Sequence, residues 1–100
     1  MKKLLAFASM ITVAVALSGT ASAQTMGIVV KVGGSPWFNA MDLGIQRKAA
    51  ELGVTAEMIG PVSPDPALQV QAIEDLIAKN VDVIGIVPND QSALEPVLKK

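Results

Sequence analysis

Three short apolar runs, each followed by a stretch of helical period, constrain the fold of this chain more than any other feature. The runs cover residues 26–32, 54–59 and 81–87, and each is expected to form a β-strand. Helices are predicted at 38–52 and 66–79, and a third begins near residue 92. Strands that alternate with helices are typical of an α/β fold with a parallel sheet. Ligands of such sheets bind beyond the carboxyl ends of the strands.

Capping residues and prolines set the expected helix boundaries. Pro36 is expected to block a helix start, so the first helix is predicted to begin at Phe38. Asp65 can cap the second helix with its carboxylate. Ser92, with Glu95 three residues later, fits a capping box at the start of the third.

The spacing of apolar residues predicts which side chains are buried. The first helix is expected to bury one stripe: Phe38, Met41, Ile45, Ala49 and Leu52. The second is expected to bury another: Val70, Ile73, Leu76 and Ile77. The run at 81–87 is apolar almost throughout, which is typical of a parallel strand covered on both faces. It is therefore predicted to be the most buried strand.

Residues 1–23 have the layout of a secretory signal peptide. A basic start precedes an apolar run over residues 4–17, and Ala-Ser-Ala ends the segment at residue 23. The run is shorter than the roughly 20 residues that a membrane-spanning helix needs. We expect cleavage after Ala23 and a periplasmic protein, with an uncleaved membrane anchor as the alternative.

Composition excludes several classes of function. Beyond residue 23 the chain has six basic and nine acidic side chains, a net charge of −3, and no basic cluster, so nucleic acid is not an expected partner. The chain has no histidine and no cysteine, the commonest general base and the thiolate nucleophile, and these are also the usual zinc ligands. The glycines after the first strand do not fit the dinucleotide fingerprint, and no P-loop is present. We therefore expect that the protein is not an enzyme and that it binds no cofactor and no metal.

Candidate binding residues follow two of the predicted strands. Lys31, Trp37 and Phe38 lie at the end of the first strand, and Asn89 and Asp90 follow the third. The carboxyl ends of parallel strands share one edge, so these side chains are expected to surround one small ligand. Aromatic faces pack on the apolar side of a sugar ring, while amides, carboxylates and ammonium groups bind hydroxyls. The set therefore indicates a sugar-like ligand.

Each of these residues has a second interpretation. Phe38 begins the apolar stripe of the first helix and is a candidate core residue, whereas Trp37 points elsewhere and suits a ligand or a domain interface. Lys31 can extend from an edge strand into solvent. Asn89 and Asp90 can simply end a strand and cap a helix.

The chain resembles the N-terminal lobe of periplasmic sugar-binding proteins of the ribose-binding type, most of all the branch for rhamnose and the furanosyl autoinducer. Ser35-Pro-Trp-Phe38 followed by Gly44 is similar to the family's Asn-Pro-Phe-Phe and glycine, and the run from Ile73 to Asp90 is similar to its second helix and third strand. The resemblance implies a three-layer αβα lobe. It implies that the rings at 37 and 38 sandwich a sugar, that Lys31 contacts it, and that the loop at 89–90 lines the cleft. Ser35 replaces the family's asparagine.

The resemblance also implies a function for the whole protein. Residues 24–100 would be the N-terminal part of the first of two lobes, truncated before the second, and the lobes would close on a sugar. The closed, monomeric protein would deliver the sugar to an inner-membrane ABC permease. An α/β enzyme with its catalytic residues beyond residue 100 is the alternative. A repressor is disfavoured because a signal peptide stands where a DNA-binding segment would be.

Overall fold

The computed structural model describes residues 24–100, and the predicted signal peptide lies outside these residues. Six elements alternate along the chain: β1 (Thr25–Val29), α1 (Pro36–Leu52), β2 (Thr55–Ile59), α2 (Pro66–Ala78), β3 (Val83–Ile86) and α3 (Gln91–Leu98). All three predicted strands and all three predicted helices are therefore present. No helix in this part of the chain combines the length and the apolar character needed to cross a bilayer.

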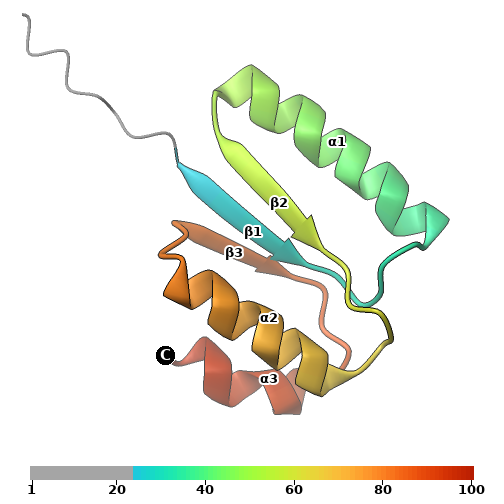
Figure 1. Cartoon of the computed structure of the whole chain (residues 1–100), viewed down its shortest axis with the longest axis vertical. Helices are drawn as coiled ribbons and strands as arrows, with labels where there is room; N and C mark the ends of the chain where they lie inside the picture. Colours follow the sequence, from blue (N-terminus) through green and yellow to red (C-terminus); the bar gives the residue numbers. More distant parts are fainter. Residues whose placement is uncertain (1–23) are drawn as a thin grey trace, which may run out of the picture.

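The three strands form one parallel sheet in the order β2-β1-β3, with β1 in the centre. Figure 1 shows α1 on one side of the sheet and α2 with α3 on the other. The predicted α/β fold with three αβα layers is confirmed. The carboxyl ends of the strands and the first turns of the helices lie at the same end of the molecule (Figure 1).

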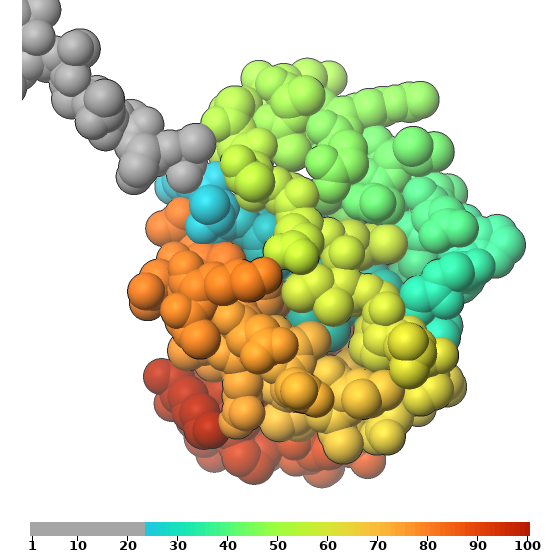
Figure 2. All heavy atoms as spheres, in the orientation of Figure 1, coloured from blue at the N-terminus to red at the C-terminus, as the bar shows by residue number. Residues whose placement is uncertain are grey.

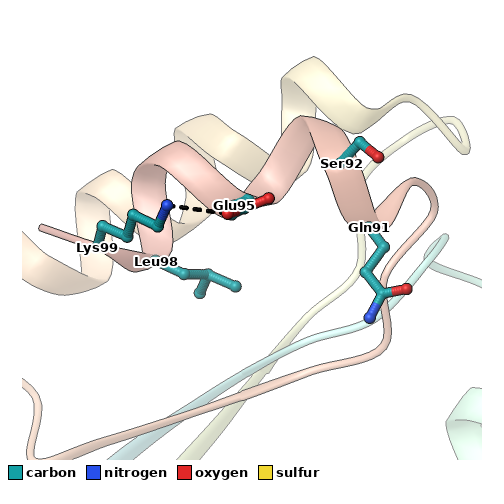
Figure 3. Close-up of a pocket in the computed structure, with 5 residues that line it drawn as sticks. All are labelled: Gln91, Ser92, Glu95, Leu98 and Lys99. Atoms are coloured by element: carbon teal, nitrogen blue, oxygen red, sulfur yellow. Dashed lines mark ion pairs between the residues drawn. The ribbon is translucent and has the colours of Figure 1, made fainter.

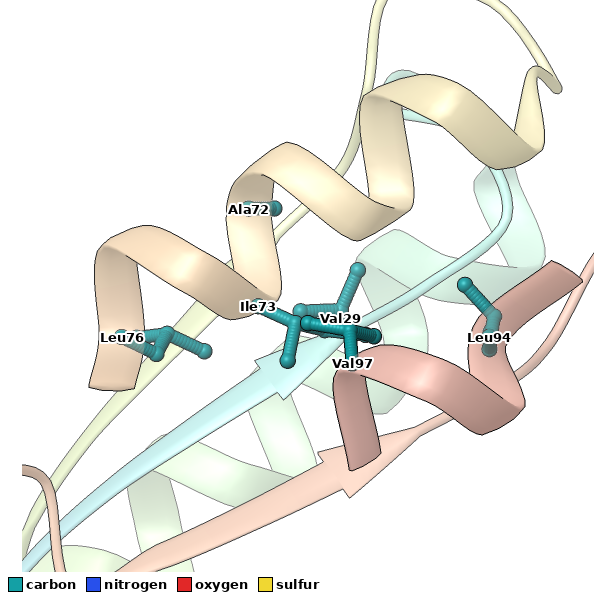
Figure 4. Close-up of a cluster of buried hydrophobic side chains, with 6 residues drawn as sticks. All are labelled: Val29, Ala72, Ile73, Leu76, Leu94 and Val97. Atoms are coloured by element: carbon teal, nitrogen blue, oxygen red, sulfur yellow. The ribbon is translucent and has the colours of Figure 1, made fainter. Parts of the chain in front are cut away.

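Two apolar clusters, one on each face of the sheet, hold the layers together. Neighbouring residues of β1 point to opposite faces. Val29 packs against α2 and α3 in the cluster of Figure 4, whose buried members also include Ala72, Ile73, Leu76, Leu94 and Val97. Ile28 and Val30 pack on the other face against Phe38 of α1. Burying both faces of the central strand stabilises the three layers through the hydrophobic effect.

Two predicted helix starts are wrong. The first helix begins at Pro36, because proline already has a helical φ angle and the first position of a helix needs no N–H donor. The third helix begins at Gln91, and its cap is Asp90, whose carboxylate accepts a hydrogen bond from Ala93 N at 3.1 Å. Ser92 lies inside the first turn and does not cap the helix.

The predicted burial is wrong at three places. Val83 of β3 is 46% exposed, and none of the β3 residues is fully buried, because β3 is an edge strand with helices packed on one face. Leu52 is 63% exposed, at the border of an apolar depression of about 220 Å³ between α1 and the sheet. Ile77 is 37% exposed because it lies at the border of the buried face of α2.

Candidate functional site

Three connecting segments meet at the carboxyl end of the sheet and form the candidate site. We call them the rim: residues 30–35 after β1, residues 60–65 after β2 and residues 87–90 after β3. In Figure 2 the teal surface of the first segment and the yellow surface of the second lie on the same side of the molecule. Ligands of parallel sheets bind at such an end.

The first two rim segments are joined by their backbones. Gly33 N donates a hydrogen bond to Pro61 O at 2.8 Å. A Cβ atom built on Gly60 would lie 2.5 Å from Gly33 Cα, and one built on Gly33 would lie 2.8 Å from Gly60 O. Only glycine at both positions allows this approach without a shift of the backbone.

The first and third rim segments are joined as well. The last rung of the ladder between β1 and β3 runs from Val87 N to Val29 O at 2.8 Å. Beyond it, Asn89 Nδ2 donates to Lys31 O at 3.3 Å. The amide of Asn89 therefore holds the main chain at Lys31, and the two predicted segments meet as expected.

Two of the predicted site residues, Lys31 in the rim and Trp37 just after it, are exposed to solvent. Trp37, in the first turn of α1, is 78% exposed, and it borders a shallow apolar depression with Ala40 and Met41. Lys31 lies beyond the end of β1, and its side chain is exposed. It takes part in none of the ion pairs found between residues 24 and 100. Both side chains are therefore available to a partner.

Phe38 has a different position. It is 9% exposed and packs with Ile28 and Val30 in the core between α1 and the sheet. Neighbouring residues on a helix differ by 100° in direction, so Trp37 points out where Phe38 points in. Phe38 serves as a core residue in this structure, and its contact with a ligand stays a prediction.

The two residues after β3 act on the backbone of the protein itself. Asp90 is exposed and caps α3, and Asn89 is half-buried against Lys31. Capping satisfies an N–H group at the start of a helix that would otherwise lack a partner. The capping interpretation is confirmed for Asp90, and ligand contact from either residue stays a prediction.

The turn into α1 leaves a hydroxyl group uncommitted. Gly34 has φ +77°, a left-handed conformation that favours glycine, and it turns the chain from the rim into the helix. Ser35 is the cap residue of α1 but makes no side-chain capping hydrogen bond. Within residues 24–100 no hydrogen bond of this hydroxyl was found, so it can bind a polar group at the rim.

One residue that bonds to the rim was not predicted from the sequence. Gln69 of α2 is fully buried, and its amide group bonds to the main chain of both the first and the third rim segments. A polar residue on the buried stripe of α2, beside Ile73 and Leu76, was the signal that could have revealed it.

A concavity of about 540 Å³ lies along α3 (Figure 3). Glu95 and Lys99 form an ion pair at 2.8 Å there, and both side chains are mostly exposed. An exposed pair of this kind contributes at most about 1 kcal/mol and gives no specific polar site. Within residues 24–100 no group of three metal-ligating side chains was found. The rim therefore remains the better candidate site.

The family match agrees with the fold. The family described as Periplasmic binding protein domain matches residues 26–100. Because this match covers most of the chain, the protein belongs to the periplasmic binding protein family.

Two relatives carry the name Ribose import binding protein RbsB. The protein of Haemophilus influenzae is 35% identical over 95 residues, which cover 94% of this chain and 32% of the relative. The protein of Bacillus subtilis is 30% identical over 82 residues, covering 82% of this chain and 27% of the relative. The chain thus spans about a third or less of the length of the curated relatives it matches.

Solved structures of solute-binding proteins have the same fold. One from Burkholderia graminis in complex with D-arabinose matches with a TM-score of 0.72 and 33% identity over 76% of this chain and 26% of that chain. One from Clostridium phytofermentas with bound L-rhamnose has a TM-score of 0.73 and 31% identity over 77% of this chain and 24% of that chain. LsrB from Clostridium saccharobutylicum, in complex with AI-2, has a TM-score of 0.73 at 21% identity over 75% of this chain and 23% of that chain, which speaks for the fold alone.

Proposed function

We propose that this protein is the substrate-binding component of an ABC importer and that it holds a small sugar at the rim. Family membership supports the class. The observation that carries the proposal is the exposed indole of Trp37, two residues after the first rim segment ends, together with the bond between Asn89 and Lys31 that joins the first and third segments. An apolar ring face beside amide, hydroxyl and ammonium groups suits the two-sided surface of a sugar.

The proposal extends to the whole protein. Residues 24–100 supply one wall of the site, and a second lobe supplies the other, so that the ligand stabilises the closed form by touching both. The signal peptide directs the protein to the periplasm, where it acts as a monomer and docks on an inner-membrane permease. The sugars named with two structural neighbours, D-arabinose and L-rhamnose, support pentoses and deoxyhexoses as the proposed ligand class.

We expect a sugar of this class to raise the melting temperature of the protein at its natural length. D-ribose, D-arabinose and L-rhamnose are tested by thermal denaturation, with mannitol at equal concentration as a control for nonspecific stabilisation. A ligand at 100 times its Kd stabilises the native state by about 2.7 kcal/mol. If none of these sugars exceeds the effect of mannitol, the proposed ligand class is wrong.

Replacement of Trp37 by alanine is expected to weaken sugar binding and to leave the fold intact. Loss of an aromatic anchor typically costs about 2 kcal/mol, or roughly 30-fold in Kd. Because the side chain is 78% exposed, the free energy of unfolding should change by no more than about 0.5 kcal/mol. Calorimetric titration and urea denaturation measure the two effects.

Two variants serve as controls for Trp37→Ala. Trp37→Phe keeps a ring and should retain most of the affinity, whereas Leu43→Ala removes another exposed apolar side chain of α1 and should leave Kd unchanged. Equal Kd values for Trp37→Ala and the parent protein would show that the indole does not touch the ligand.

A further inference from the structure

Gln69 is the only fully buried polar side chain between residues 24 and 100. It lies near the start of α2 and extends from that helix toward the ends of β1 and β3, two strands that it does not adjoin in sequence. A buried amide without partners is costly, so a glutamine at such a place has a specific task.

All the hydrogen bonds of the Gln69 amide go to the main chain. Nε2 donates to Val30 O at 3.0 Å and to Val87 O at 2.9 Å, and Oε1 accepts from Asn89 N at 2.8 Å. The opposite orientation of the amide would place its oxygen against two carbonyl oxygens, so the hydrogen-bond pattern fixes the orientation. One side chain therefore holds three backbone groups of two rim segments.

These three groups lie just beyond the end of the sheet. The ladder between β1 and β3 ends at the pair Val29 and Ile86, so the carbonyl groups of Val30 and Val87 have no strand partner in that ladder. Gln69 supplies the missing donors where the two segments leave the sheet. Without it these two carbonyl groups would lose their donor, and beyond the ladder the segments would be joined only by the bond from Asn89 Nδ2 to Lys31 O.

We propose that Gln69 is a positioning residue for the sugar site: it holds the main chain before Lys31 and at Asn89 in the geometry that the ligand requires. This inference rests on the proposed function. Binding groups must be held within about 0.5 Å of their productive positions, and supporting residues behind them provide that precision. Gln69 is buried behind the rim, so it acts through the backbone and does not touch the ligand.

The three hydrogen bonds of the Gln69 amide, which we call the Gln69 clamp, require a glutamine at this position. Methionine has a similar length and fills the space but offers no strong donor or acceptor, so it leaves three backbone groups unpaired. Asparagine is one methylene shorter, and its amide cannot span the same three partners from α2. Glutamate keeps the acceptor for Asn89 N but presents oxygens to the two carbonyl groups, where donors are needed.

The test compares Gln69→Met with a core variant of equal stability in the protein at its natural length. Ile73, one turn further along the buried face of α2, provides the control: Ile73→Val or Ile73→Ala is chosen to match the melting temperature of Gln69→Met. The ligand is whichever of D-ribose, D-arabinose and L-rhamnose raises the melting temperature of the parent protein. At a temperature where all variants are folded, Gln69→Met should raise the Kd for this sugar by about tenfold or more. The Ile73 variant should change it less than about twofold. Equal losses in both variants, or no loss in Gln69→Met, would overturn the proposal.

Hydrogen exchange of the backbone N–H group of Asn89 gives a second readout that needs no ligand. In the free parent protein this amide should exchange about 100-fold more slowly than the amide of the exposed Val62, because Gln69 already holds it. Gln69→Met should remove that protection, and the Ile73 control should keep it. Fast exchange in the free parent protein would show that Gln69 does not hold this N–H group. This measurement decides the question even if Gln69→Met does not fold.

The two readouts separate this inference from the proposed function. If no sugar binds the parent protein, the proposed function fails, yet loss of Asn89 protection in Gln69→Met alone still supports the clamp. If sugars bind the parent protein and Gln69→Met with equal affinity, the proposed function stands and the positioning role is wrong.

Discussion

Leu76→Ala is expected to reduce the free energy of unfolding by about 2–5 kcal/mol. Leu76 is fully buried and packs with Val29 and Ile73 between α2 and the sheet (Figure 4). Its methyl groups lie directly over Gly27, where a Cβ atom would come within 2.4 Å of Leu76 Cδ2. Truncation would leave a cavity at this contact that β1 cannot fill, because Gly27 has no side chain.

Urea denaturation of the parent and variant proteins measures this loss. Leu98→Ala, which truncates the same residue type at an exposed position of α3, is the control and should cost less than about 1 kcal/mol. A loss below about 1 kcal/mol for Leu76→Ala would mean that the layers collapse onto the shorter side chain.

Gly60→Ala is expected to destabilise the protein by about 1–3 kcal/mol and to weaken sugar binding as well. The added Cβ atom would meet Gly33 Cα at 2.5 Å and Gly33 N at 2.7 Å. Both are backbone atoms, so no side chain can rotate away to relieve the contact. The first and second rim segments would have to separate, and the hydrogen bond from Gly33 N to Pro61 O would stretch or break.

A glycine-to-alanine substitution in α1 provides a control for which we expect a stability change of opposite sign. Gly44 lies inside the helix, and a Cβ atom there would meet nothing within 4 Å. Gly44→Ala should therefore stabilise the protein by about 0.5–1 kcal/mol. Thermal melts with calorimetric titrations test both variants. A Gly60→Ala protein with the parent's stability and Kd would show that the two segments part without cost.

The periodicity of the sequence predicted the helices well because each helix buries apolar residues at helical spacing. Ile73 and Leu76 on α2 follow helical spacing and are fully buried. Their neighbour Ile77 marks where the stripe ends, and periodicity alone does not show how wide a face the sheet can cover. The burial of β3 was overestimated for a similar reason: an apolar run does not reveal whether helices cover both faces of its strand.

Local signals were less reliable at helix starts, where several residues compete. A proline breaks a helix when it lies in the interior, but it is favourable at the first position, so Pro36 supports two interpretations. Asp90 and Ser92 are both good caps. The observed choice follows from tertiary structure, because Gln69 holds Asn89, and Asp90, the next residue, is thereby placed to cap α3.

The candidate site was predicted in part because strand order brings its segments together. Lys31 and Asn89 are adjacent, as the parallel sheet required, and Trp37 points outward from α1. Gln69 was missed because its partners, Val30 and Val87, lie 39 and 18 residues away along the chain. No local pattern specifies contacts of that range, and they emerge only when the layers pack.

The order β2-β1-β3 makes the two margins of the sheet unequal. β2 carries Glu57, whose side chain pairs with Lys79 across 3.6 Å, and a charge of this kind discourages a foreign strand from adding alongside. β3 is Val-Ile-Gly-Ile and has no charged side chain. If residues 24–100 are produced by themselves, self-association in concentrated solution should begin along β3, and a lysine placed at Val83 is the natural gatekeeper against it.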